Sequence, residues 1–300
     1  MNKGWILEAT RRAGLGARAS SNSPALVGSR SDSGSPRIRI GLALGGGFAR
    51  GIAHAGVLKV LEQCRVPIHC ITGVSAGAIV AAAYASGRTP DEIVRAGCSM
   101  RFGDVGRWRP RLLGLMGSDH MHRFLKRTLK AHRFEDMAIP LGVVATDLSS
   151  GQPMPFSGTG EVFESIRASC SYPGLFQPVR YRGKLLVDGA MSMEIPAELC
   201  RQLGATHVIS VQLPARAPRA QPGNMLEVVY RCFQILQGTS EHGWRNQTDL
   251  VISPDVAAVA WNGFDRGRQL VEAGEAAALG AIAEIQEWFV HNRSGALMAA

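Results

Sequence analysis

Short apolar runs alternate along the chain with longer stretches in which apolar residues recur at helical spacing. The runs are bounded by glycine, proline or polar residues and predict buried strands at 38–44, 66–72, 141–145, 207–213 and 250–253. The longer stretches predict helices at 51–63, 76–86, 118–130, 161–169, 196–203, 225–237 and 265–289. This alternation predicts an α/β fold in which a mainly parallel central sheet lies between two layers of helices, α/β/α.

Local signals refine this pattern. Thr89-Pro90-Asp91-Glu92 is a capping box with proline at the first helical position, so a further helix begins there. Residues 179–182 and 185–187 flank Gly183-Lys184 and predict a β-hairpin, which gives the sheet a mixed edge. Residues 101–117 show neither the helical nor the strand spacing of apolar residues and are expected to be irregular. Ser118 is the predicted cap of the helix at 118–130.

One stretch, 66–87, carries no Lys, Arg, Asp or Glu and is long enough to span a bilayer. Its proline, its polar residues and its three glycines favour a buried strand, turn and helix instead.

The ends of the chain differ in composition from its middle. Residues 1–36 are rich in Ser and Arg and contain no apolar core of signal-peptide length, which predicts a disordered basic tail, with a transit peptide as the alternative. We expect one folded domain at 37–290, a C-terminal tail at 291–300, and a cytoplasmic protein, with peripheral attachment to a membrane as an option. The six cysteines are scattered without a C-x-x-C pair, which favours free thiols in a reducing compartment.

The formal net charge of +9 is unevenly distributed. Residues 101–133 hold nine Lys or Arg and two Asp, a balance of +7, whereas 134–300 hold twelve basic and seventeen acidic residues, a balance of −5. This distribution does not indicate a nucleic-acid-binding protein. The basic segment fits either contact with an anionic membrane or a solvated charged face. Within it, Arg107–Leu113 mixes basic, aromatic and aliphatic residues and fits either a membrane-contacting lid or a surface loop.

The pentapeptide Gly73-Val74-Ser75-Ala76-Gly77 is a G-x-S-x-G motif between a predicted strand and a predicted helix. A serine at such a sharp turn is pushed out of the sheet, and the helix N-terminus favours developing negative charge. Ser75 is therefore the candidate nucleophile, with Gly73 and Gly77 as support and the Ala76 amide as one oxyanion donor.

A second glycine-rich loop, Gly45-Gly46-Gly47-Phe48-Ala49-Arg50-Gly51, joins the first strand to the first helix. Its free amides suit a phosphate or an oxyanion. The G-x-G-x-x-G and Walker A patterns both fail here, so beside the serine motif an oxyanion hole is favoured.

The serine needs a base, and Asp188, which ends an apolar strand before Gly189, is the candidate. A histidine could complete a triad, with His207, His242 and His291 available downstream of the aspartate, but none has a distinguishing context. His120 and His122 resemble a metal pair, but no third ligand is evident, and a charged helix face is favoured.

These three motifs occur in the order and approximate spacing of the patatin-like phospholipases, and the chain resembles that family over about residues 38–290, closest to bacterial relatives of the neuropathy target esterase branch. The segment Ala168–Phe176 also resembles the family's stretch before the aspartate. The resemblance implies a Ser75–Asp188 dyad, an oxyanion hole in the Gly45–Gly47 loop ordered by Arg50, an acyl-ester lipid as substrate (a phospholipid or lysophospholipid), and no metal or cofactor.

The chain departs from the family in one place, because Met193-Glu194 stands where paired asparagines are common. Glu194 is expected either to raise the pKa of Asp188 or to loosen its loop. Two alternatives therefore stay open: a general carboxylesterase with a histidine-completed triad, and a catalytically weak, membrane-associated regulatory protein. Acyl chain length, head group and oligomeric state are not encoded in these patterns.

Overall fold

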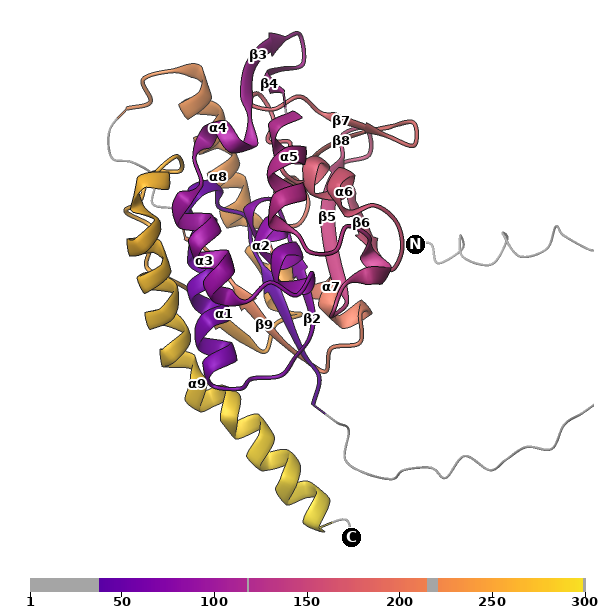
Figure 1. The fold of residues 1–300 in the computed structure, drawn as a ribbon, viewed down its shortest axis with the longest axis vertical. Helices are drawn as coiled ribbons and strands as arrows, with labels where there is room; N and C mark the ends of the chain where they lie inside the picture. The colour runs from indigo at the N-terminus through magenta and orange to yellow at the C-terminus, as the bar shows by residue number, and fades with distance from the viewer. Residues whose placement is uncertain (1–37, 118, 215–220, 299–300) are drawn as a thin grey trace, which may run out of the picture. The chain divides into compact units, whose positions relative to one another are not determined.

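The computed structural model describes residues 38–117, 119–214 and 221–298 (Figure 1). The basic tail at 1–36 and the predicted cap Ser118 lie outside them. The strands are β1 (Ile40–Leu44), β2 (Ile68–Gly73), β3 (Arg107–Arg111), β4 (Gly114–Gly117), β5 (Leu141–Asp147), β6 (Pro153–Ser157), β7 (Val179–Tyr181), β8 (Lys184–Asp188), β9 (His207–Val211) and β10 (Leu250–Ile252). The α-helices are α1 (Ala53–Gln63), α2 (Ala76–Ala85), α3 (Pro90–Ser99), α4 (Phe102–Val105), α5 (Asp119–Thr128), α6 (Val162–Ser169), α7 (Ala197–Gln202), α8 (Met225–Arg245) and α9 (Gly267–Met298).

The central sheet has the order β10-β9-β1-β2-β5-β8-β7, with β6 paired to β5 beside this path. The five strands from β10 to β5 are parallel, whereas β6, β7 and β8 run antiparallel to their neighbours. The predicted α/β architecture with a mainly parallel, mixed-edge sheet is therefore confirmed, as is the β7–β8 hairpin.

One edge of strand β5 pairs with two different strands. Val143 of β5 lies opposite Gly73 of β2, and Ala145 lies opposite Asp188 of β8. β6 occupies the other edge over Gly142–Thr146. β2 and β8 therefore follow one another along the same edge of β5, which brings the end of β2 close to Asp188.

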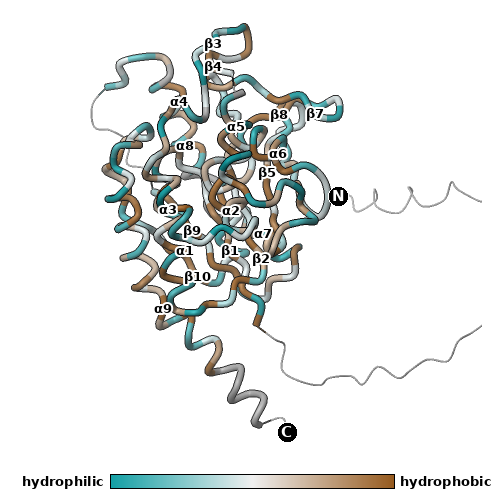
Figure 2. The backbone as a smooth tube through the Cα atoms, in the orientation of Figure 1, coloured by the Kyte–Doolittle hydropathy of each residue, from teal (hydrophilic) through white to brown (hydrophobic). Residues whose placement is uncertain are grey.

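The two faces of the sheet carry different helices. On one face Ile40, Leu42 and Leu44 of β1 pack in the main hydrophobic core with apolar residues of α1, α2, α3, α5, α6 and α9. On the other face Ala43 packs with residues of α7 and with Trp244 of α8. Alternate side chains of β1 therefore point to opposite faces of the sheet, as expected for a strand that is buried on both sides. Figure 2 shows hydrophobic residues along β5 in the middle of the body and hydrophilic ones at the outer loops.

The prediction that residues 101–117 are irregular was wrong. They form α4 and an antiparallel hairpin of β3 and β4. All five residues of β3 are exposed, so the strand shows no apolar alternation and gives no strand signal. β6 was also missed, because its two prolines are atypical of a strand interior.

The last two helices are longer than their patterns indicated. α8 continues to Arg245, and α9 runs to Met298, past residue 290, where the folded domain was expected to end. The stretch 66–87 forms β2 and α2, as predicted. Among the helices of the described residues, none has an apolar stretch long enough to cross a membrane.

Candidate active site

Ser75 lies in the turn between β2 and α2, with φ of 53° and ψ of −123°. A non-glycine residue with positive φ is strained, and the surrounding contacts must hold it in place. Its own amide donates a hydrogen bond to Ser169 Oγ on α6 at 2.8 Å, and both residues are buried. The turn thus has the geometry of a nucleophile elbow, and Ser169 is a support that the motif did not reveal.

The two glycines of the motif are required by close backbone packing. A Cβ at Gly73 would lie 2.5 Å from the Gly77 carbonyl group, and a Cβ at Gly77 would lie 2.4 Å from the oxygen of Leu44. Both distances are shorter than side chains tolerate, so the start of α2 packs directly on the end of β1.

The glycine-rich loop lies beside Ser75. A Cβ built at Gly46 would be 3.5 Å from Ser75 Cβ. Among the described residues, the amides of Gly46, Gly47 and Ala76 donate to no acceptor, so they are available to an anion at Ser75. The amide of Gly45 instead donates to Val211 O at 3.1 Å as part of the sheet. The geometry therefore removes Gly45 from the expected oxyanion donors and leaves the other three.

Two buried side chains hold this loop. The guanidinium of Arg50 donates to Gly47 O at 3.5 Å, to Pro214 O at 3.4 Å and to the Tyr230 hydroxyl. His54, on α1, is fully buried and bonds Gly45 O through Nε2 at 2.9 Å. Because a carbonyl oxygen only accepts, Nε2 carries the proton, and burial lowers the pKa of His54 to about 4.

Asp188 ends β8 and is 1% exposed. Its Oδ1 accepts from the Ala190 amide at 3.0 Å, whereas its Oδ2 has no hydrogen-bond partner among the described residues. Burial raises the pKa of Asp188 to about 7, against the opposing effects of the Ala190 amide and the Ser75 hydroxyl. Gly189 is held close to β5, since a Cβ there would lie 2.1 Å from Val144 O.

Ser75 and Asp188 both open into a cavity of about 210 Å³. Its wall combines the glycine-rich loop with aromatic and polar side chains, namely Gly46, Gly47, Phe48, Arg50, Ser75, Tyr172, Asp188, Ala190, Glu194, Gln212, Leu213, Pro214, Tyr230, Gln234 and Gln237. Two small, mainly apolar cavities adjoin it at Phe48. The site thus offers a serine hydroxyl, a buried carboxylate, free amides and nearby apolar space.

Glu194, which stands where the family often has asparagine, lines the same cavity, and its Oε2 accepts from Trp244 Nε1 at 3.2 Å. Burial is the largest cause of the raised pKa of Asp188.

Of the three histidines considered for a triad, His207 has a described side chain, and its strand position lies away from Ser75. His207 lies opposite Ile40 at the start of the parallel strands, whereas Ser75 follows their carboxyl ends, where Leu44 lies opposite Gly73. The side chains of His242 and His291 lie outside the described residues. His120 bonds Gly103 O, and no group of three metal-binding side chains occurs within the described ranges.

Comparison with known families gives a match to the model described as patatin-like phospholipase over residues 42–201, which is more than half of the chain. The match includes both glycine motifs and Asp188.

Among known proteins, the chain is 32% identical over 182 residues to lysophospholipase nte1 of Aspergillus fumigatus, across 58% of this chain and 12% of that protein. It is 30% identical over 182 residues to patatin-like phospholipase domain-containing protein 6 of Mus musculus, across 58% of this chain and 13% of that protein. The chain therefore matches only a small part of these much longer relatives.

Among solved structures, the chain is similar to the type III effector protein ExoU, with a TM-score of 0.48 and 16% identity over 84% of this chain and 54% of that chain. It is also similar to VipD from Legionella pneumophila, with a TM-score of 0.44 and 13% identity over 82% of this chain and 70% of that chain.

Proposed function

Since the chain belongs to the patatin-like phospholipase family, we propose that it is a serine acyl-ester hydrolase acting on lipids, with Ser75 as nucleophile and Asp188 as base. One observation carries the proposal. The strained turn at Ser75 and the buried carboxylate of Asp188, whose Oδ2 has no hydrogen-bond partner among the described residues, follow strands that pair along one edge of β5.

In the proposed reaction Asp188 Oδ2 accepts the proton of the Ser75 hydroxyl as Oγ attacks the ester carbonyl. The amides of Gly46, Gly47 and Ala76 stabilise the negative charge on the carbonyl oxygen, assisted by the N-terminus of α2. The proton then passes to the leaving alcohol, and an acyl group stays on Ser75. Water attacks this ester while Asp188 accepts one of its protons. As the bond to Ser75 Oγ breaks and the carboxylic acid leaves, Asp188 returns this proton to Ser75 Oγ.

A carboxylate is ordinarily a weak base for a hydroxyl. The burial of Asp188, which raises its pKa to about 7, makes it a stronger one near neutral pH. The unpaired Oδ2 is then the atom available for the proton. Arg50 and His54 act as positioning residues in this scheme, because they bind the carbonyls of the oxyanion loop.

For the substrate we propose a phospholipid or lysophospholipid. The relative from Aspergillus fumigatus bears the name lysophospholipase, and the apolar cavities beside Phe48 provide space for hydrocarbon next to Ser75.

The first experiment is hydrolysis of a short-chain p-nitrophenyl ester by the wild type, Ser75→Ala and Asp188→Asn, followed by a lysophospholipid. We expect turnover by the wild type only, with both variants folded by circular dichroism. A fluorophosphonate probe should label the wild type but not Ser75→Ala. A wild type that is inert towards both esters and unlabelled by the probe would remove the hydrolase assignment.

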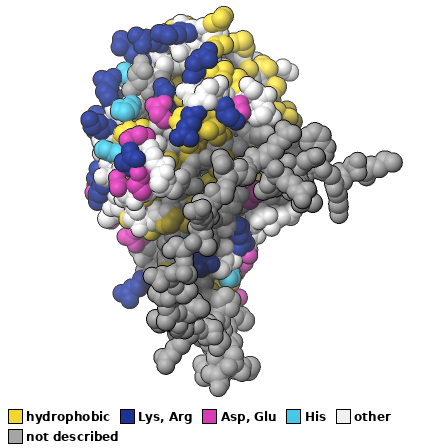
Figure 3. Space-filling model, turned by 90° about the vertical axis from the view of Figure 1, so that its right-hand side faces the viewer, with side chains coloured by type: hydrophobic (Ala, Val, Ile, Leu, Met, Phe, Trp, Pro, Cys, Tyr) yellow, Lys and Arg dark blue, Asp and Glu magenta, His cyan; other side chains and the backbone are white. Residues whose placement is uncertain are grey.

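We further propose that the protein reaches its substrate by peripheral contact with an anionic membrane through the β3–β4 hairpin. Trp108, Leu112 and Leu113 are 64%, 100% and 53% exposed. They stand among three exposed arginines, Arg107, Arg109 and Arg111. Aromatic and aliphatic side chains flanked by arginine favour the boundary between head groups and acyl chains. Figure 3 shows basic and hydrophobic side chains together at the upper end of the molecule, where Figure 1 places the hairpin.

The hairpin also lies near the candidate active site. The Met116 amide donates to Leu175 O, and Leu175 together with Tyr172 lines one of the apolar cavities beside Phe48. Sedimentation with phosphatidylglycerol vesicles tests the contact. Leu113→Ser and Trp108→Ala should release the protein, and raised salt should weaken binding. Leu279→Ser, at a comparably exposed position on α9, is the matched control. Equal binding by all four proteins would exclude the hairpin as the contact.

A further inference from the structure

Buried polar atoms without a partner gather around one cavity in the described part of the chain. Seven side-chain nitrogen or oxygen atoms there are buried and form no hydrogen bond, and four of them belong to residues that line the cavity at Ser75. These four are Asp188 Oδ2, Tyr172 Oη and both amide atoms of Gln234, Oε1 and Nε2. The proposed reaction uses Asp188 Oδ2 but neither Tyr172 nor Gln234.

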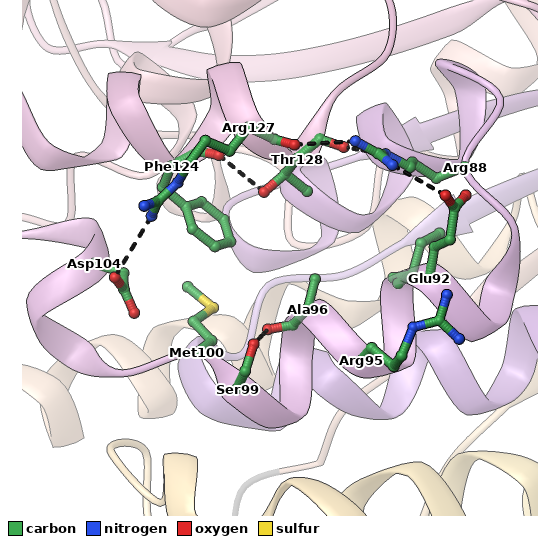
Figure 4. Close-up of a pocket in the computed structure, with 11 residues that line it drawn as sticks. Arg88, Glu92, Arg95, Ala96, Ser99, Met100, Asp104, Phe124, Arg127 and Thr128 are labelled. Carbon is green, nitrogen blue, oxygen red and sulfur yellow. Dashed lines mark hydrogen bonds and ion pairs between the residues drawn. The ribbon is translucent and has the colours of Figure 1, made fainter.

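A larger cavity between α3 and α5 has no such atoms. It measures about 510 Å³, and polar side chains surround it (Figure 4). Arg88 binds Glu92 at 3.0 Å, and the hydroxyl of Thr128 donates to Phe124 O at 2.8 Å. None of the seven unpaired atoms belongs to a residue of this wall. The unpaired atoms thus distinguish the cavity at Ser75 from the larger one.

Gln234 lies on the side of α8 that faces the cavity at Ser75. It follows Tyr230 by one helical turn, and both residues line this cavity. Phe233, the neighbour of Gln234, packs edge-on against Tyr172, with ring centroids 5.2 Å apart. α8 and the segment that contains Tyr172 therefore meet at the cavity.

Tyr172 is held close to both parts of the proposed catalytic machinery. It directly follows Ser171, whose carbonyl oxygen accepts from the Asp188 amide at 3.0 Å. Its ring packs edge-on against Phe48 of the glycine-rich loop, with ring centroids 4.9 Å apart. Burial, and after it the charge of Asp188, raises the pKa of Tyr172 above its usual value, so its hydroxyl stays protonated and can donate.

On the basis of the proposed function, we infer that the amide of Gln234 binds a free hydroxyl next to the scissile ester, in the alcohol part of the substrate. The hydroxyl of Tyr172 donates to a further oxygen of the same alcohol. The acyl chain lies in the apolar cavities beside Phe48, and the alcohol lies in the polar cavity. The substrate class is then a monoester of a diol or triol, which is the arrangement in a monoacylglycerol and in a lysophospholipid.

The two unpaired atoms of Gln234 select a hydroxyl over other polar groups. The amide nitrogen donates and the amide oxygen accepts, and a hydroxyl can do both in return. A phosphate oxygen only accepts, and an ammonium group only donates. The carboxyl groups of Asp188 and Glu194 in the same wall also disfavour an anion. A diacyl lipid, whose neighbouring hydroxyl is esterified, has no proton to donate to Gln234 Oε1.

Two octanoate esters of nearly equal size, 2-hydroxyethyl octanoate and propyl octanoate, test the inference. Each enzymatic rate is divided by the rate of alkaline hydrolysis of the same ester. We expect the wild type to prefer the hydroxyethyl ester by roughly ten- to hundredfold in kcat/KM, because only that ester pairs the buried amide. Gln234→Leu should bring this preference close to one. Gln286→Leu, at an exposed glutamine of α9, is the control and should keep it.

Tyr172→Phe is tested with 1-octanoylglycerol, which carries one hydroxyl more than the hydroxyethyl ester. The wild type should prefer the glycerol ester, and Tyr172→Phe should lose that preference. Lysophosphatidylglycerol with the same acyl chain is the second source of this alcohol. Both glycerol compounds should be cleaved faster than their 2-O-methyl derivatives, and the faster of the two identifies the source. Faster cleavage of the 2-O-methyl derivatives would overturn the inference.

Stability separates a binding role of Gln234 from a structural one. An unpaired buried amide destabilises the free protein, so Gln234→Leu should raise the midpoint of urea denaturation while it lowers selectivity. A lower midpoint in Gln234→Leu would mean that the amide supports the fold, and would overturn its assignment to the substrate.

An ether that the reaction cannot cleave tests binding without catalysis. In isothermal titration the full chain should bind 2-(hexyloxy)ethanol about tenfold more tightly than its methyl-capped form, and Gln234→Leu should bind both equally. A protein that hydrolyses both octanoate esters at equal rates loses the hydroxyl site and keeps its proposed reaction. An inert protein that still distinguishes the two ethers loses the reaction and keeps the site. Equal binding of the two ethers by the wild type would overturn the inference.

Discussion

The amide of Ser75 donates a 2.8 Å hydrogen bond to the hydroxyl of Ser169, a residue 94 positions further along the chain. Ser75 lies between β2 and α2, and its amide donates to Ser169 Oγ and not to either element. Ser169 supplies the acceptor from α6. The elbow is thus stabilised by a contact from a distant helix as well as by its own glycines.

We expect Ser169→Ala to destabilise the protein by about 1–3 kcal/mol, because a buried amide loses its acceptor. Ester hydrolysis should fall with it, since the turn that presents Ser75 is no longer fixed. Chemical denaturation and the rate with a p-nitrophenyl ester measure the two effects.

The control is Ser165→Ala. Ser165 lies on the same helix and is equally buried, but its hydroxyl donates only to Val162 O within α6. A loss of activity as large in Ser165→Ala would mean that Ser169 has no special role at the elbow.

The pH dependence of the reaction should follow Asp188. Its pKa of about 7 means that the carboxylate is largely protonated at pH 5 and ionised at pH 9. Because only the ionised form accepts the serine proton, kcat/KM should rise through about pH 7 to a plateau. A profile that is flat between pH 5 and 9 would contradict the assignment of Asp188 as the base.

A histidine base would give a similar profile, so the profile should be repeated at several temperatures. The pKa of a carboxyl group changes little on heating, whereas that of an imidazole falls. An apparent pKa that falls steadily on heating would favour a histidine.

Asp188 should also lower the stability of the fold at high pH. Its pKa is about 7 in the folded chain, against 3.8 for an ordinary aspartate. Between these values the folded protein holds a proton that the unfolded chain has released, so the free energy of unfolding falls as pH rises towards 7. A difference of about three pKa units corresponds to about 4 kcal/mol.

Asp188→Asn removes this ionisation and should therefore stabilise the protein more at pH 8 than at pH 5, while it removes activity. Thermal unfolding of both proteins at the two pH values measures this. If the variant has the same effect at both values, the aspartate does not titrate between them.

The same substitution at two helical glycines should have opposite results. Gly77→Ala places a Cβ 2.4 Å from Leu44 O and 2.6 Å from Gly45 O, so β1 and α2 must separate. Gly280→Ala, on α9, meets nothing within 4 Å and should stabilise the protein by about 1 kcal/mol. Denaturation midpoints decide this, and an increase in stability for Gly77→Ala would refute the close packing.

The elements that the sequence predicted well are those with a local signal. The G-x-S-x-G motif between β2 and α2 and the Thr89 capping box depend on neighbouring residues, and both were recognised. The strand that ends at Asp188 was also predicted, because the apolar run before it is a local signal.

The supports of the site have no local signal. Ser169 lies in an ordinary amphipathic helix, and His54 lies among the apolar residues of α1, so only their contacts with Ser75 and Gly45 reveal their role. The amide of Gly45 could not be distinguished from those of Gly46 and Gly47, because its bond to Val211 depends on the pairing of β1 with β9.

The shared edge of β5 also makes the proposed chemistry depend on strand register. Ser75 follows β2, whereas Asp188 ends β8, and both strands pair with β5. A shift of β8 by one residue would turn Asp188 to the opposite face of the sheet. The serine would then lack its proposed base although every helix and strand was still present. The proposed hydrolytic chemistry therefore requires the β5–β8 pair to form in the register in which Ala145 lies opposite Asp188.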